Sequence, residues 1–292
     1  MLMENQNKGL RSAYALAFTC MVAFMGIGLV DPILKTIAVK LNATPAQTTL
    51  LFTSYMLVTG IIMLFTGFIS TRIGAKRTIS IGLIIIVLFA ALAGRSQTIS
   101  QLISLRAGWG FGNALFLSTA LTAIVSVMPE KTEQAIMLYE GSMGIGMAVG
   151  PLVGGALGSF SWRFPFYGVA ILMFVAAMTI VFLLEPIAKP VKKARFFAGA
   201  VALKNHRLRS IGIIALLYNF GFFTILAYAP FLLVGLTEMQ VGFVFFGWGI
   251  LLAIASVFVA PRLEQKTNTL MTLLIGLGFF LVCLVVIGIN AD

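Results

Sequence analysis

The sequence contains little of the chemistry that soluble enzymes use. Its 292 residues include one histidine, two cysteines and 10% charged residues. It has no Gly-x-x-x-x-Gly-Lys-Ser/Thr loop for nucleotide phosphates and no acidic or Cys/His cluster with metal-site spacing. Cys20 and Cys283 both fall in apolar stretches, so no disulfide framework is indicated. We therefore predict that the chain is not an enzyme or a primary pump and that it needs no cofactor or metal.

Long apolar stretches take the place of these groups. Hydrophobic residues make up 60% of the chain, and a soluble protein of this composition would be covered in apolar patches. Unbroken apolar runs of about twenty residues favour membrane helices over the alternating strands of a membrane barrel. The nine candidate spans are 12–30, 46–69, 79–95, 101–127, 135–158, 164–184, 210–236, 240–260 and 268–290. We expect an all-α protein embedded in the lipid bilayer, with a first helix that is retained rather than cleaved as a signal peptide.

The basic residues predict the orientation of these spans. If the N-terminus is cytoplasmic, most of the 20 Lys and Arg residues fall in cytoplasmic loops, as the positive-inside rule requires. The loop cations on the other side are then Lys35, Lys40, Arg95 and Arg163. This distribution explains the net charge of +11 without a nucleic-acid partner.

The longest loop predicts the domain boundary. Residues 185–209 are rich in cations and contain Pro186 and Pro190, so we expect a basic cytoplasmic linker there. It would separate a bundle of six helices, 1–184, from a second bundle of three, 210–292. Internal repetition supports two related bundles, because Phe68, Arg72 and Lys76 after the second span align with Phe258, Arg262 and Lys266 after the eighth.

A glycine-proline run lies inside the fifth span. Gly146, Gly150 and Gly154 recur at every fourth position, which forms a stripe along which a neighbouring helix can approach closely. Pro151 removes a backbone hydrogen bond, which a membrane helix tolerates only where the freed carbonyl finds another partner. An ordinary tightly packed helix pair would explain the same spacing.

Taken together, three segments resemble the major facilitator superfamily, and within it the proton-coupled drug and metabolite antiporters. The loop after the second span resembles the family's Gly-x-x-x-Asp-Arg-x-Gly-Arg-Lys-x pattern, and the fourth span resembles its Arg-x-x-x-Gly-x-Gly pattern. The fifth span resembles the motif of the antiporter branches. The residues that carry these matches are Gly67, Arg72, Gly74, Lys76 and Arg77; Arg106, Gly110 and Gly112; and Gly146, Gly150, Pro151, Gly154 and Gly155.

The resemblance implies a bacterial cytoplasmic-membrane transporter, with a small-molecule substrate and protons as its partners. The first choice is proton-coupled export of a small amphipathic organic compound or drug, and the alternative is proton-coupled uptake of a metabolite. Two departures leave open a truncated, inactive or regulatory protein. Thr71 and Ala75 stand where the family carries Asp and Arg. The family's plan has twelve helices, so we expect truncation after nine, with missing C-terminal helices or a partner chain supplying the rest.

Ionisable residues within the spans are candidates for proton coupling, because placing one there costs about 2.5 to 3.5 kcal/mol. We expect Asp31 and Arg106 to form a coupled pair and Glu140 to provide a further proton or cation site. Alternatively, Asp31 is interfacial at a helix end and Glu140 reaches the inner surface. Polar or aromatic candidates for a substrate cavity are Tyr55, Asn113, Tyr218, Asn219 and Phe222, each of which could instead bond between helices.

Overall fold

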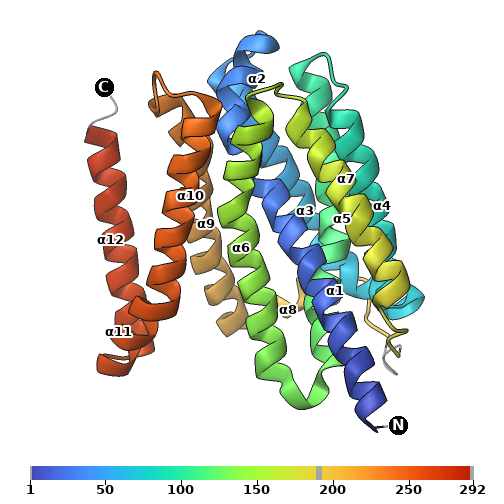
Figure 1. Cartoon of the computed structure of the whole chain (residues 1–292). Coiled ribbons are helices and arrows are strands. Elements are labelled where there is room, and N and C mark those ends of the chain that lie inside the picture. The colour runs from blue at the N-terminus through green and yellow to red at the C-terminus, as the bar shows by residue number, and fades with distance from the viewer. Residues whose placement is uncertain (1, 189–192, 290–292) are drawn as a thin grey trace.

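The computed structural model describes residues 2–188 and 193–289, and these form helices joined by turns, with no strand among them (Figure 1). The predicted all-α class is confirmed. The elements are α1 (Leu2–Gly28), η1 (Asp31–Ile33), α2 (Leu34–Lys40), α3 (Pro45–Ile73), α4 (Ala75–Ala93), α5 (Ile99–Val127), η2 (Pro129–Lys131), α6 (Thr132–Gly158), α7 (Phe164–Leu183), α8 (Ala198–Ala202), α9 (His206–Leu232), α10 (Glu238–Ile254), η3 (Ala255–Val259), α11 (Ala260–Lys266) and α12 (Thr269–Ile289).

Eight segments in the described part of the chain are long and apolar enough to cross a membrane. They match eight of the nine predicted spans. The other prediction, 240–260, corresponds to α10, which has 17 residues and continues into the π-helix η3. The protein is therefore a multi-pass membrane protein.

The first predicted span, 12–30, ends close to the end of α1 at Gly28, but the buried apolar segment continues beyond it. The apolar segment runs from Gly9 to Lys40, because η1 and α2 extend it beyond α1. Pro32 lies in the first turn of η1, where its missing N–H removes no helical hydrogen bond. Leu34 and Ile37 then continue the buried surface.

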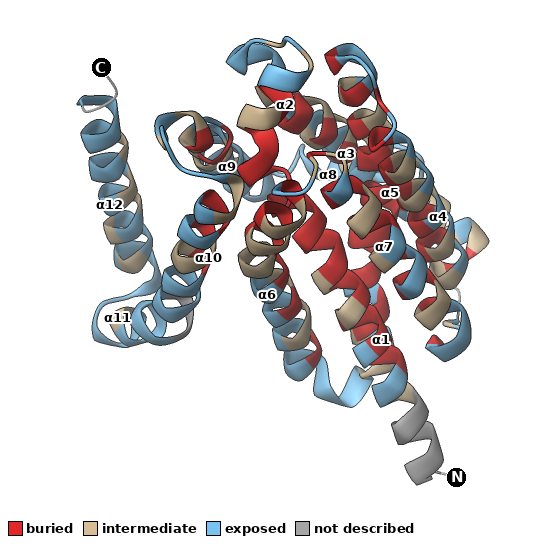
Figure 2. Ribbon diagram, turned by 45° about the horizontal axis from the view of Figure 1, so that its top comes forward, coloured by how far each residue is buried: buried red, intermediate tan, exposed pale blue. Residues whose placement is uncertain are grey.

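Most buried side chains belong to one cluster (Figure 2). It is built by α1, η1, α2, α3, α4, α5, α6 and α7, which we call the N-terminal group, and Ala227 of α9 packs into it. Helices α9, α10 and α12 form the C-terminal group, which holds a small cluster of Leu226, Val241 and Phe245. The apolar surface of α12 is exposed along its length.

The predicted linker contains more helix than expected. α8 lies within it, and α9 begins at His206 because the Asn205 side chain accepts hydrogen bonds from the backbone N–H of Arg207 and Leu208. Residues 189–192 of the linker lie outside the described residues. The division into 1–184, 185–209 and 210–292 stays a prediction.

Helices α3 and α10 share the repeat seen in the sequence. Both begin with a Thr-x-x-Gln capping box. Near the end of each helical segment, an arginine donates a hydrogen bond to the backbone carbonyl of the phenylalanine four residues earlier and lies over its ring. The matching residues are Thr44, Gln47, Phe68 and Arg72 on α3, and Thr237, Gln240, Phe258 and Arg262 from α10 to α11. The same kinds of local contact at both places support an internal duplication.

Candidate functional site

Arg106 lies fully buried two turns inside α5, between two aromatic rings. Its guanidinium carbon lies 4.6 Å from the ring centroid of Tyr55 on α3 and 4.7 Å from that of Trp109 on α5. The two rings meet edge to face, with their centroids 6.5 Å apart. A desolvated cation–π contact of this kind contributes about 2 kcal/mol, so the rings hold the cation in place.

Asp31 is buried in the same part of the protein. It begins η1 and is fully buried rather than exposed at a helix end. The charges of Asp31 and Arg106 interact electrostatically. Among the described residues, however, neither carboxylate oxygen nor any guanidinium nitrogen has a hydrogen-bond partner. Burying an ionisable group costs free energy, so two buried ionisable side chains without direct hydrogen bonds are candidates for a functional role.

The face of α5 that carries Arg106 packs closely on α3. A Cβ atom at Gly110 would lie 2.5 Å from the backbone oxygen of Tyr55. The Thr59 hydroxyl lies 2.7 Å from that same oxygen and 3.0 Å from the Gly110 oxygen. Asn113, one turn further on, is buried, and its side-chain oxygen has no partner in the described part of the chain. The small residue at 110 thus lets the two helices enclose Arg106.

The other sequence candidates lie elsewhere. Glu140 is exposed on α6 and is not buried with Asp31 and Arg106. Tyr218 and Phe222 stack on α9 with centroids 6.0 Å apart, and the side chain of Asn219 donates to the backbone of its own helix. The structure therefore brings Tyr55 against Arg106, buries Asn113 two turns further along the same face of α5, and places Tyr218, Asn219 and Phe222 on the C-terminal group.

Sequence reasoning missed several aromatic residues at both places. Trp109 lies three positions after Arg106, which puts it on the same face of α5, and this spacing could have identified it. Phe280 on α12 lies 5.7 Å from Tyr218, and Trp248 on α10 lies 5.6 Å from Phe222, measured between centroids. No local spacing links these residues, because they come from three different helices.

The glycine stripe on α6 packs against the backbone of α1. Cβ atoms at Gly146, Gly150 and Gly154 would lie 2.3, 2.6 and 2.2 Å from the backbone oxygens of Met21, Met25 and Leu29, respectively. Each of these distances is shorter than any ordinary contact, so only glycine fits. The close helix approach predicted from the spacing is present. Pro151 fits here as well, because its ring packs against Gly28 of α1.

A second face of α6 packs equally closely on α10, so α6 lies between α1 and α10 (Figure 1). A Cβ atom at Gly242 would lie 2.7 Å from the Pro151 oxygen, and one at Gly155 would lie 2.5 Å from the Glu238 oxygen. Further along, a Cβ atom at Gly249 would lie 2.8 Å from Ala148. The two helix groups thus meet along small residues of α6.

The end of α3 and the start of α4 bind the last turn of α7 and the segment that follows it. Lys76 donates to the backbone oxygens of Val181 and Leu184, at 2.9 and 2.6 Å. Thr71, which stands where the resembled pattern has Asp, accepts a hydrogen bond from the backbone N–H of Ala194 at 3.2 Å. The hydroxyl therefore takes the acceptor role that a carboxylate would have. Arg72 donates to the Ala194 oxygen at 3.1 Å.

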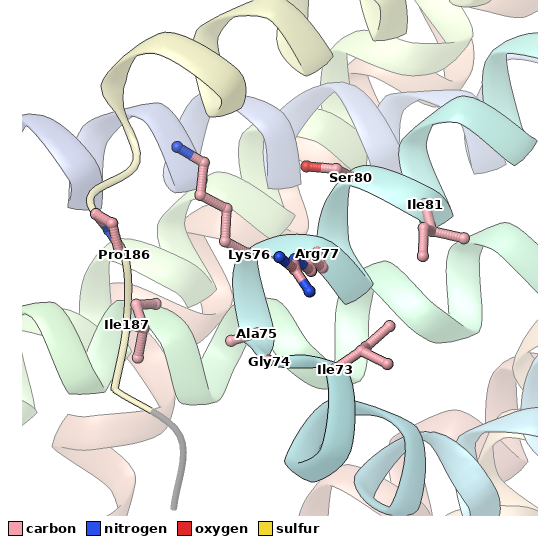
Figure 3. A pocket seen from close by; sticks show the side chains of 9 residues that line it. All are labelled: Ile73, Gly74, Ala75, Lys76, Arg77, Ser80, Ile81, Pro186 and Ile187. Atoms are coloured by element: carbon pink, nitrogen blue, oxygen red, sulfur yellow. The ribbon is translucent and has the colours of Figure 1, made fainter.

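Gly74 makes the turn between α3 and α4 with a φ of 96°, a conformation that favours glycine. Beside the turn is an open pocket of about 600 Å³ (Figure 3). Its lining residues are Ile73, Gly74, Ala75, Lys76, Arg77, Ser80, Ile81, Pro186 and Ile187. The pocket combines Gly74, Lys76 and Arg77, which belong to the loop pattern of the resembled family and which we expect to act in conformational change, with the start of the linker.

Comparison with known proteins gives consistent matches. A profile of the Major Facilitator Superfamily matches residues 16–290. The Bacillus subtilis (strain 168) protein named multidrug efflux protein YfmO is 52% identical over 292 residues, covering 99% of this chain and 74% of the relative. The Serratia proteamaculans (strain 568) putative multidrug resistance protein MdtD is 26% identical over 158 residues, covering 52% of this chain and 32% of the relative.

Solved structures show the same fold. A bacterial homologue of the human lysosomal transporter Spinster, in an inward-facing and unoccupied conformation, matches with a TM-score of 0.76 and 18% identity, covering 89% of this chain and 63% of its own. A D-xylose–proton symporter matches with a TM-score of 0.63 and 13% identity, covering 88% of this chain and 69% of its own.

Proposed function

This chain belongs to the Major Facilitator Superfamily, and from that premise we propose that it exports small amphipathic organic compounds in exchange for protons. The B. subtilis relative, which is named for multidrug efflux, supports export as the direction. Alternating access between two groups of helices provides the mechanism, and an ion gradient provides the energy. The proposed position is a bacterial cytoplasmic membrane with the N-terminus inside.

The observation that carries this proposal is the buried pair Asp31 and Arg106. A carboxylate beside an arginine can be charged or protonated, and exposure to each side of the membrane in turn lets it load and release a proton. Arg106 stays charged throughout, because a guanidinium does not lose its proton in proteins. Glu140, exposed on α6, is proposed as a further proton or cation site.

We propose that the substrate binds between the two groups of helices. Tyr55 and Asn113 would contact it from the N-terminal group, and Tyr218, Asn219 and Phe222 from the C-terminal group. Aromatic faces with few hydrogen-bonding groups suit an amphipathic compound, including an organic cation. The close glycine contacts of α6 would give the two groups a rigid surface on which to rock.

The contacts between the groups support an inward-facing arrangement. They lie toward the end of the bundle at which α1 finishes, which we call the Asp31 end, and include Glu238 with Gly155 and Gly242 with Pro151. Toward the opposite end, Leu216 of α9 and Leu251 of α10 are exposed. With the N-terminus in the cytoplasm, the Asp31 end would be the outer end, and it would be closed.

Transport into everted membrane vesicles tests the proposal. The probe is a fluorescent lipophilic cation, and its accumulation should depend on a proton gradient and collapse when a protonophore is added. Asp31→Asn and Arg106→Lys should each lower this accumulation at least about tenfold, because the first fixes one charge state and the second removes the planar group held between two rings. Glu133→Gln, at an exposed carboxylate of α6, is the matched control and should retain activity. Full transport by Asp31→Asn would contradict the proposal, and substrate movement along with protons would indicate uptake instead.

A further inference from the structure

A short segment joins the candidate proton site to the start of α10. It consists of η1 and α2, begins with Asp31, and contains Thr36 five residues later. The Thr36 hydroxyl donates a hydrogen bond to the carboxylate of Glu238, the first residue of α10. This bond connects the N-terminal group of helices to the C-terminal group.

Packing fixes Glu238 from both sides. A capping box between Thr237 and Gln240 sets the first turn of α10, with the N–H of Gln240 donating to the Thr237 hydroxyl at 3.3 Å. The Cβ atom of Glu238 lies 3.8 Å from the position of a Cβ at Gly158, the last residue of α6. Ile33 of η1 packs on this same glycine. The ends of η1, α6 and α10 therefore meet at Gly158.

The carboxylate is also stabilised where it stands. Glu238 is half-buried in the first turn of α10, and a negative charge is favourable at a helix N-terminus. One oxygen accepts from Thr36, which lies on the helix that continues directly from Asp31. A movement of α10 away from α2 breaks this bond and removes one of the contacts that hold the segment carrying Asp31.

We propose that Glu238 is a positioning residue that keeps the Asp31 end closed by holding Thr36. Its release lets the η1–α2 segment move and exposes Asp31 to the outer solution, so the opening of the outer end and access to the proton site occur together. This inference rests on the proposed function, since it assigns a step of alternating access to Glu238.

A buried cysteine at the boundary between the groups reports on this closure. Ala227 of α9 is buried in the cluster of the N-terminal group, and Ala227→Cys adds one sulfur atom. The background is Cys283→Ser, because Cys283 is exposed, whereas Cys20 is fully buried. Membrane-impermeant maleimide is applied to the outside of intact cells that express the full chain, and its rate of reaction is measured.

The substitutions are chosen to separate the hydrogen bond from the charge. Thr36→Val and Glu238→Ala each remove one partner and should raise the labelling rate about three- to tenfold, which is the effect of one net hydrogen bond. Thr36→Ser and Glu238→Gln keep a donor and an acceptor, respectively, and should stay within about twofold of the parent. The double variant Thr36→Val with Glu238→Ala should label no faster than either single variant, because both remove the same bond.

An unchanged labelling rate in Thr36→Val would overturn the inference, and so would Glu238→Gln behaving like Glu238→Ala, since charge rather than hydrogen bonding would then hold the end closed. The vesicle assay keeps the two proposals apart. If labelling responds as expected but the protein shows no proton-coupled export, the role of Glu238 in closing the Asp31 end stands and the proposed function is refuted. If the protein exports the probe but labelling does not respond to the substitutions, the proposed function stands and the role of Glu238 is refuted.

Discussion

At the scale of single residues, the site depends on how Arg106 is enclosed. The sequence predicted that Arg106, Gly110 and Asn113 share one face of α5, because that follows from helical spacing alone. It did not predict the contact of Arg106 with both Tyr55 and Trp109, since this depends on the depth and side-chain conformation that α3 and α5 impose together. Helical periodicity gives the face of a residue but not its partner across a helix boundary.

The Tyr55 hydroxyl provides a test at this scale. It is buried and has no hydrogen-bond partner among the described residues, while the ring of Tyr55 contacts Arg106. Tyr55→Phe keeps the ring and removes an unsatisfied polar group. We therefore expect the free energy of unfolding in detergent to stay the same or to rise by up to about 1–3 kcal/mol. We also expect transport to fall severalfold, because the hydroxyl would bond substrate in another state.

Tyr55→Leu is the control, because it removes the ring and should lower both stability and transport. Loss of stability in Tyr55→Phe would show that the hydroxyl has a structural partner. Transport equal to that of the parent would remove Tyr55 from the proposed substrate site.

At the scale of elements, α6 is the helix whose sequence pattern was most informative. The four-residue spacing of its glycines predicted one closely packed face, and the structure places that face on the backbone of α1. The second face, on α10, was not predicted. Ala148 and Gly155 on α6 and Gly242 and Gly249 on α10 are each two helical turns apart, but this spacing does not say which helices face each other. The sequence also did not predict that the chain stays buried beyond the end of α1, through Asp31 and Pro32 of η1 and into α2.

Two glycines of α6 allow a matched comparison. A Cβ atom at Gly154 would lie 2.2 Å from the Leu29 oxygen, whereas one at Gly144 would meet nothing within 4 Å. Gly154→Ala should lower the free energy of unfolding by about 1–3 kcal/mol, because the added methyl group overpacks the contact with α1. Gly144→Ala should leave the free energy of unfolding unchanged or raise it by up to about 1 kcal/mol, since alanine favours the helix. Thermal unfolding of both variants in detergent measures the difference, and equal midpoints would contradict the packing shown for α6.

At the scale of the whole molecule, the order and number of spans could be predicted well, since uninterrupted apolar length is a strong signal. The end at which the two groups are closed could not be read from it. That property depends on contacts between α6 and α10 and between Thr36 and Glu238, which join residues far apart in the chain. The sidedness of the protein is predicted by charge and can be measured directly.

Two exposed loop positions provide this measurement. Gln97 lies between α4 and α5, and Glu130 lies between α5 and α6. In a Cys283→Ser background, Gln97→Cys should react with an impermeant maleimide in intact cells, and Glu130→Cys should react only after permeabilisation. This outcome follows from the excess of cations on the side of Glu130. Labelling in the opposite pattern would reverse the proposed orientation and, with it, the side to which the closed end faces.

The contact between α1 and α6 has an evolutionary consequence. Met21, Met25 and Leu29 meet the glycines of α6 through their carbonyl groups, which every amino acid possesses. Saturation mutagenesis under selection for resistance should therefore show unequal tolerance on the two helices. Almost every replacement of Gly146, Gly150 or Gly154 should be eliminated, whereas apolar replacements at the three α1 positions should be retained. New compound spectra would then arise by drift on α1 and α9, with α6 held constant.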